Sequence, residues 1–259
     1  MNFTMITWLL FTGLLLSMLA TAEIGRRIGI ARLARVPEGL PKGVGAVDGA
    51  VFALLGLLLA FSFSGAASRF EDRRHLITAE TNAIGTAFLR IDMLPGDVQP
   101  EMRDLFRRYV DGRLETYRNV ADVVATKASL AEDQALQQEI WTKSVAASMR
   151  PGVPSPTAML LLAALNEMID ITTTRVMATR NHPPVAIFIM LVAMCLVSSL
   201  LVGYGASVNK DHSWLHTLVF AIVLSMTTYV IIDLEFPRLG LIRVEGADIA
   251  LVELRESMR

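Results

Sequence analysis

The residues of this chain that could hold a metal ion are His212 and His216, which are four residues apart and stand beside Asp211. Two imidazoles at this spacing lie on one face of a helix and can share a metal ion. A metal site needs three or four ligands, however, and the sequence offers neither a third histidine nearby nor the glutamate of an H-E-x-x-H motif. We therefore interpret both histidines as interfacial side chains and predict no metal site.

Sequence motifs of enzymes are absent: the chain has no G-x-S-x-G, no G-x-G-x-x-G and no P-loop. The single cysteine, Cys195, lies in an uncharged segment, so an intrachain disulfide and a cysteine-based metal site are excluded. Glu167 and Asp170 lie near Arg175, but without a partner base or a nucleophile we interpret these three charges as surface salt bridges. The sequence predicts neither an enzyme nor a cofactor.

Carboxylates stand at the borders of the uncharged segments, namely Glu23, Asp48, Asp233 and Glu235. A charge inside hydrocarbon is costly and is then usually functional, but all four are expected at the interface, where water reaches them. Repeated around a symmetric oligomer, they would attract cations at the mouth of a pore. The interpretation that we favour makes them interface anchors, paired with Arg238 or Arg26.

Basic residues follow one uncharged segment directly, beginning at Arg69 and Arg73. At the mouth of a pore these two side chains would contact permeating ions or phospholipid headgroups. More commonly such a cluster is a solvated face, or a face whose long side chains reach from the end of a membrane span into water.

Four segments are uncharged for about 20 residues or more, which is long enough to cross the hydrocarbon core of a membrane. They are residues 1–22, 49–68, 183–209 and 213–232. Basic residues follow the first segment rather than precede it, so we interpret that segment as an uncleaved span and not as a signal peptide. The net charge of −1 provides no field for nucleic acid, and we predict no binding to it.

The second span runs into charged residues without a helix breaker. No proline lies between Ser68 and Pro95, and Ile77, Ile84 and Ile91 keep a helical spacing. The pattern predicts one helix through residue 93. Further amphipathic helices are expected over 97–124, 129–149 and 155–181, the second of them on a capping-box signature. The uncharged run 158–165 is too short to cross a membrane and is predicted to be a core helix.

The fold class predicted from these patterns is an all-α membrane protein with four transmembrane helices and a helical soluble domain inserted between spans 2 and 3. Residues 1–68 would hold spans 1 and 2 with a basic connecting loop, residues 69–182 the helical domain, residues 183–236 spans 3 and 4, and residues 237–259 an amphipathic tail packed on the helical domain.

Residues near the end of the second span resemble a known family. Phe61, the small residues 65–68, Arg69, Phe70, Arg73 and Leu76 resemble the pattern that ends the second span of bacterial bestrophins, which are pentameric ion channels, although the family usually has Trp at the position of Phe70. The whole chain resembles the four-span bestrophin-like proteins of bacteria through Glu23-x-Gly25-x-Arg27-x-Gly29, Ala83-Ile84-Gly85-x-Ala87-x-x-Arg90 and Asp233-x-x-x-Pro237-Arg238-x-Gly240. The resemblance implies a homo-oligomer in the bacterial inner membrane, in contact with lipid and with inorganic ions.

The same resemblance places a pore aromatic at Phe61. Leu57 and Ala53 then lie one and two turns earlier on the same helix face, and the three residues would form a hydrophobic neck that gates by losing its water. The alternative is that this face packs inside a helix bundle, where the small residues Gly49, Gly56 and Ala60 would allow a close approach.

Two functions therefore remain open. The first is a passive ion channel with its neck on span 2, and the second is a non-conducting scaffold or sensor whose helical domain binds a partner. The side of the membrane also remains open. The basic loop 25–42 favours a cytoplasmic loop and an outer helical domain by the positive-inside rule, whereas the bestrophin plan places that domain inside.

Overall fold

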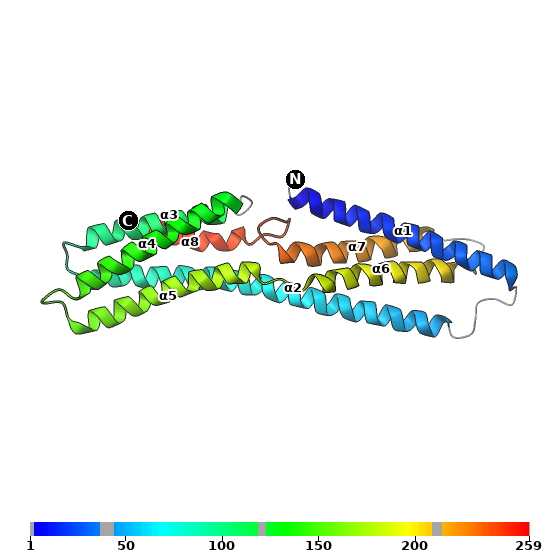
Figure 1. Cartoon of the computed structure of the whole chain (residues 1–259), viewed down its shortest axis with the longest axis horizontal. Coiled ribbons are helices and arrows are strands. Elements are labelled where there is room, and N and C mark those ends of the chain that lie inside the picture. Colours follow the sequence, from blue (N-terminus) through cyan, green and yellow to red (C-terminus); the bar gives the residue numbers. More distant parts are fainter. Residues whose placement is uncertain (1–2, 37–43, 119–122, 209–213, 259) are drawn as a thin grey trace. The chain divides into compact units, whose positions relative to one another are not determined.

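The structure, a computed structural model, describes residues 3–36, 44–118, 123–208 and 214–258, and within these ranges every regular element is a helix. The helices are α1 Phe3–Arg35, α2 Val44–Leu89, the short 3₁₀ helix η1 Arg90–Met93, α3 Gln99–Arg118, α4 Val123–Ser148, α5 Ser155–Arg180, α6 Val185–Ala206, α7 Trp214–Glu235 and α8 Glu245–Ser257 (Figure 1). Four segments of this described part of the chain are long and apolar enough to cross a membrane. The predicted fold class is confirmed.

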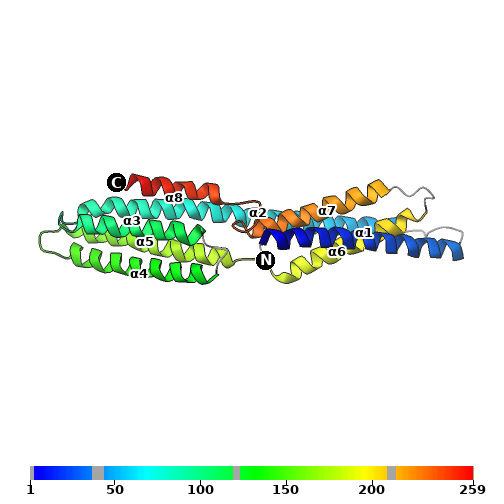
Figure 2. The ribbon, with the colours of Figure 1, turned by 90° about the horizontal axis from the view of Figure 1, so that it is seen from above.

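The chain divides into two compact units. The first, which we call the membrane unit, comprises Met1–Ser68 and His182–Ile242, and the second, the helical unit, comprises Arg69–Asn181 and Arg243–Arg259. Figure 2 shows α1, α6 and α7 together with the first half of α2, and α3, α4, α5 and α8 together with its second half. Helix α2 thus contributes to both units.

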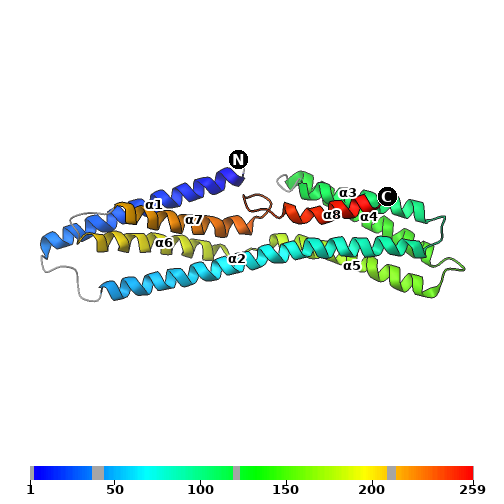
Figure 3. The same cartoon turned by 180° about the vertical axis from the view of Figure 1, so that it is seen from behind.

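Helix α2 is unbroken from Val44 to Leu89 and is followed by η1 as far as Met93 (Figure 3). The predicted continuation of span two into the amphipathic helix is therefore confirmed. On the membrane side Leu55 is buried in a cluster with Leu14 and Met18 of α1, Cys195 of α6 and Ala221 of α7. This cluster fixes which face of α2 points into the bundle.

Helix α1 extends well beyond the predicted end of span 1. We ended the span at residue 22 because Glu23 is charged, but α1 continues to Arg35. The Glu23 carboxylate accepts hydrogen bonds from Nε of Arg26 at 2.9 Å and Nε of Arg27 at 2.8 Å, which are one helical turn further along. The predicted loop at 25–42 is thus helical to Arg35, and residues 37–43, including Lys42, lie outside the described residues.

Glycines allow α1 and α6 to approach closely. A Cβ atom on Gly203 of α6 would overlap the backbone of Ala22, and one on Gly25 of α1 would overlap the backbone of Leu200. A hydrogen bond also joins the two helices: the Ser199 hydroxyl of α6 donates to the carbonyl oxygen of Met18 of α1, at 2.6 Å. Small residues on facing helices are the usual means of close packing in a membrane, and here they explain the glycine at position 25 of the Glu23-x-Gly25 pattern.

The helical unit has its own apolar core, to which α2, α3, α4, α5 and α8 contribute. Its fully buried side chains include Ile77 and Ile84 of α2, Phe106 of α3, Ile140 of α4, Leu161 and Leu165 of α5, and Leu251 of α8. The run 158–165 is thus a core helix, as predicted. Helix α4 begins at Val123, before the capping-box signature at Ser129 that was expected to start it, so that prediction was wrong.

We expect Gly203→Ala to destabilise the membrane unit, because the added methyl group must displace the backbone of α1. Overpacking of this kind costs about 1–3 kcal/mol. Gly205→Ala is the matched control on the same helix, since a Cβ there would meet no described atom within 4 Å. Thermal unfolding in detergent measures both, and an unchanged melting temperature for Gly203→Ala would contradict the packing described for α1 and α6.

Candidate functional site

The three predicted neck residues lie on one face of α2, spaced one turn apart. In the single chain Leu57 is 52% exposed and Phe61 69% exposed, and Ala53 is exposed as well. Leu55, which points to the other side of the helix, is only 3% exposed. Among the described residues, the face that carries the neck candidates is therefore largely free of packing contacts, and it is available to lipid or to another copy.

Two of the small residues on the membrane half of α2, Gly49 and Gly56, contact no other described part of the chain closely. Gly49 and Gly56 are exposed, and a Cβ atom on either would meet no described atom within 4 Å. This differs from Gly25 and Gly203, where an added Cβ atom would overlap the backbone of the facing helix. The described part of the chain thus gives no support to the alternative in which the neck face packs inside the chain's own bundle.

Arg73 is buried at the end of α5. Its guanidinium donates from Nε to the carbonyl oxygen of Ala178 at 3.2 Å and from Nη2 to that of Asn181 at 3.1 Å. The last carbonyls of a helix lack partners within the helix and carry partial negative charge, which an arginine neutralises. Arg73 therefore caps α5, while Arg69, one turn earlier, is partly exposed.

Asp233 is fully buried and holds the turn that follows α7. Its carboxylate accepts hydrogen bonds from the backbone N–H groups of Leu241, at 3.0 and 3.1 Å, and of Ile242, at 2.7 Å. A Cβ atom on Gly240 would overlap this carboxylate. The pattern Asp233-x-x-x-Pro237-Arg238-x-Gly240 is thus a backbone-capping motif, in which the glycine makes room for the acid.

Glu235 is also buried, and its Oε2 lies 3.4 Å from Nδ1 of His182. The His182 ring stacks on Phe236, with ring centroids 4.7 Å apart. Of the predicted carboxylate pairings with Arg26 or Arg238, the one between Glu23 and Arg26 is confirmed. The contacts described for Asp233 are with backbone amides, and the contact described for Glu235 is with a histidine.

The predicted histidine pair falls partly outside the structure, because Asp211 and His212 lie outside the described residues. His216 is described, and its neighbours along the same surface of α7 are the apolar residues Val219 and Phe220. Within the described ranges, no group of three or more histidine, cysteine, aspartate or glutamate side chains could hold a metal ion.

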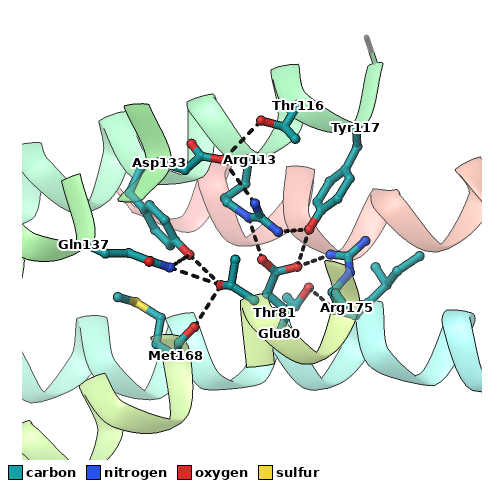
Figure 4. Close-up of polar contacts among 12 residues, drawn as sticks. Glu80, Thr81, Arg113, Thr116, Tyr117, Asp133, Gln137, Met168 and Arg175 are labelled. Atoms are coloured by element: carbon teal, nitrogen blue, oxygen red, sulfur yellow. Dashed lines mark hydrogen bonds and ion pairs between the residues drawn. The ribbon is translucent and has the colours of Figure 1, made fainter. Parts of the chain in front are cut away.

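A buried charge cluster in the helical unit was not predicted. Figure 4 shows it around Glu80 of α2, which is fully buried. Oε1 of Glu80 accepts from Nε of Arg113 of α3 at 2.7 Å, and Oε2 accepts from the Tyr117 hydroxyl at 3.0 Å and from Nη1 of Arg175 of α5. Our interpretation of Arg175 as a surface residue was therefore wrong, since this arginine is buried against Glu80.

The cluster continues from Arg113 to α4. Nη1 of Arg113 donates to Oδ2 of Asp133 at 3.0 Å, and the Thr116 hydroxyl donates to the same oxygen at 3.1 Å. The guanidinium carbon of Arg175 also lies 3.8 Å from the centre of the Tyr117 ring, a cation–π contact. Two arginines and two carboxylates from four helices thus meet away from water.

Burial and charge act in opposite directions on the two carboxylates. Burial would raise the pKa of Glu80, but the guanidiniums of Arg113 and Arg175 outweigh burial and lower the pKa below its usual range. Burial also raises the pKa of Asp133, and there Arg113 and Thr116 offset only part of the effect. Glu80 is therefore held ionised, whereas Asp133 is the carboxylate that most readily takes a proton.

Comparison with known proteins points to one family. The sequence model of the bestrophin-like domain matches residues 12–249. No curated protein matches the chain significantly. A crystal structure of a mutant bacterial bestrophin homolog from Klebsiella pneumoniae is similar with a TM-score of 0.69 at 14% identity, covering 95% of this chain and 96% of that one. A second mutant form gives 0.68 at 15% identity, covering 94% and 97%. A crystal structure described as a membrane protein gives 0.66 at 12%, covering 93% and 95%.

We expect Glu80→Gln to destabilise the helical unit by about 3–5 kcal/mol, because two buried guanidiniums would lose their common anion. Since the pKa of Glu80 is lowered in the folded chain, its contribution is present above the ordinary glutamate pKa of about 4.3 and is lost as the pH falls through the folded value. Glu71→Gln, on the exposed surface of the same helix, should cost less than about 1 kcal/mol. Thermal unfolding in detergent compares the two variants, and equal losses would contradict the assignment.

Proposed function

The chain belongs to the bestrophin-like family, and on this basis we propose that it is a passive ion channel whose pore is lined by the exposed face of α2 from several copies. The observation that carries the proposal is that Leu57 and Phe61 are exposed on a helix that is long and apolar enough to cross a membrane. Large apolar side chains on that face need lipid or protein against them. A ring of copies would supply protein, and would place the face around an axis.

The neck of this channel would consist of rings of Ala53, Leu57 and Phe61, one from each copy. A narrow apolar ring holds no stable column of water, so ions cannot keep their hydration shells in it and the pore closes by dewetting. Apolar rings of this kind hinder cations and anions alike. We therefore propose passage of inorganic ions controlled by the width of the neck, with little discrimination by charge at the neck itself.

Charges near the pore would act mainly through their effect on the structure. Arg73 and Asp233 both engage backbone groups of their own chain, so releasing either would expose unsatisfied carbonyls or amides. Arg69, which is partly exposed, is the better candidate for contact with ions or lipid headgroups at a pore mouth. We propose that in every copy of the ring Arg73 and Asp233 hold the structure, while Arg69 contacts ions or lipid headgroups.

We expect the protein to be an integral membrane homo-oligomer of the bacterial inner membrane, a pentamer by its resemblance to bestrophins. Its apolar helices are too long to be hidden in the core of a soluble protein of this size. It should resist extraction by alkaline carbonate, and its protein mass in mild detergent should be a multiple of 28.4 kDa. A monomer mass would count against a pore between copies.

We expect the double variant Leu57→Ala and Phe61→Ala to conduct more ions than the wild type. Smaller side chains widen the neck and let water enter, which raises flux without sharpening selectivity. Ion flux into liposomes at matched protein incorporation, repeated with different salts, measures both effects.

Phe63→Ala is the matched control for this experiment. Phe63 is an exposed aromatic on α2 as well, but it lies two residues beyond Phe61 and so points about 200° around the helix. This variant should leave flux unchanged. If wild type and double variant both fail to conduct while remaining folded oligomers, the non-conducting scaffold or sensor becomes the better account.

A further inference from the structure

One oxygen of the buried charge cluster lacks a partner. Oδ2 of Asp133 accepts hydrogen bonds from Arg113 and Thr116, but Oδ1 is buried and no donor from the described residues reaches it. Oδ1 lies against Gly112 of α3, where a Cβ atom would approach to 2.5 Å. A buried carboxylate oxygen without a donor is a costly arrangement, and a proton is the simplest group that relieves it.

The groups that face Asp133 come from every helix packed around it. Helix α3 provides the positive charge of Arg113 and the hydroxyl of Thr116, both bonded to Asp133, and the hydroxyl of Tyr117, which is bonded to Arg113. Helix α2 provides the negative charge of Glu80, which is bonded to Arg113. Helix α5 provides the positive charge of Arg175, which is bonded to Glu80. These four charges cancel while Asp133 is ionised. When Asp133 is protonated, the cluster carries one net positive charge, and Arg113 keeps Glu80 as its anionic partner.

We propose that Asp133 is a proton-operated switch that regulates the pore: a proton taken up by its carboxylate releases α4 from Arg113 and lets Arg113 and Glu80 adopt a second arrangement that raises ion flux. The proton comes from hydronium in the solvent: one O–H bond of the hydronium ion breaks and leaves water, and the new O–H bond forms on the Asp133 carboxylate. This inference rests on the proposed channel function for its effect on flux, but the switch itself belongs to the helical unit alone.

The raised pKa of Asp133 supports the proposal, because burial favours its protonated form, while Arg113 and Arg175 lower the pKa of Glu80 and favour its ionised form. The Tyr109 hydroxyl, one turn before Arg113 on α3, keeps its proton, since burial raises its pKa to about 12. Of the two carboxylates in the cluster, Asp133 is therefore the one that takes up a proton first as the pH falls.

Glu80 connects the switch to the neck. Its carboxylate is bound from two other helices, by Arg113 and Tyr117 of α3 and by Arg175 of α5. Glu80 lies on the same unbroken helix as Phe61, about five turns further along. While Asp133 is ionised, Arg113 of α3 is bonded both to Glu80 of α2 and to Asp133 of α4, so it links the three helices. Protonation of Asp133 releases α4 from Arg113, and α2 is then held less firmly by the other helices.

Trp141 of α4 provides a readout that does not depend on conduction. It is partly buried and packs against the core of the helical unit, so its fluorescence changes if α4 moves. In a chain that carries Trp8→Phe and Trp214→Phe, we expect the emission of Trp141 to shift between about pH 7.5 and pH 4 along a curve for one proton. Asp133→Asn, which mimics the protonated acid, should hold the acid spectrum at every pH.

Three further variants keep the test decisive. Thr116→Val removes one hydrogen bond to the ionised carboxylate of Asp133 without removing the acid, so the midpoint of the Trp141 curve should move to higher pH. This variant tests the switch even if Asp133→Asn does not fold. Histidines titrate in a similar range, so His75→Gln and His182→Gln serve as controls that should leave the curve in place. A pH-independent spectrum, or a midpoint that Thr116→Val does not move, would overturn the switch.

Flux in liposomes at the same pH values then tests the link to the pore. We expect flux to rise as the pH falls with the midpoint of the Trp141 curve, and Asp133→Asn to conduct at neutral pH as the wild type does in acid. A Trp141 transition without flux at any pH would refute the channel and leave the switch standing. Flux that follows pH equally in wild type and Asp133→Asn would overturn the proposed regulation.

Discussion

Helix α2 has to satisfy two environments along its length, and most of the structure depends on how it does so. In hydrocarbon the backbone must make its own hydrogen bonds, so only the faces of the helix remain for contacts. Leu55 of α2 is buried in the bundle of the membrane unit, whereas Leu57 and Phe61 of the same helix are exposed. Beyond Ser68 the same helix buries Ile77 and Glu80 in the helical unit. The proposed neck and its proposed regulation are therefore properties of one helix.

Charges at the ends of the spans are engaged by groups that would otherwise lack partners. Asp233 binds backbone amides after α7, Arg73 binds the last carbonyls of α5, and Glu23 binds two arginines of its own helix. Removing Asp233 or Arg73, which are buried, would leave backbone groups unsatisfied, at a cost of about 1–3 kcal/mol or more. This favours a pore in which an apolar neck controls the ions, and in which most of the border charges hold the helices in place.

Local patterns predicted the elements of this fold, but not the contacts between distant residues. The uncharged runs and the absence of proline between Ser68 and Pro95 were sufficient for the spans and for the continuity of α2. The extension of α1 beyond Glu23 was missed because the charge of Glu23 was taken as the end of the span, whereas this carboxylate pairs with Arg26 and Arg27 within the same helix. Arg175 was misplaced for a different reason, since its partner Glu80 is far away in the sequence.

A local signal for the buried cluster did exist. Glu80 lies three residues after Ile77 and four before Ile84, on the face of α2 that enters the core, and Arg113 lies four residues after Tyr109 on the buried face of α3. A charge at a core position of an amphipathic helix is unfavourable unless an opposite charge meets it, so each residue implied a partner. Replacing the whole cluster by apolar residues need not weaken the fold. The cluster therefore makes more physical sense as a device that responds to charge than as a source of stability, and Oδ1 of Asp133, which no donor of the described residues reaches, identifies where it would respond.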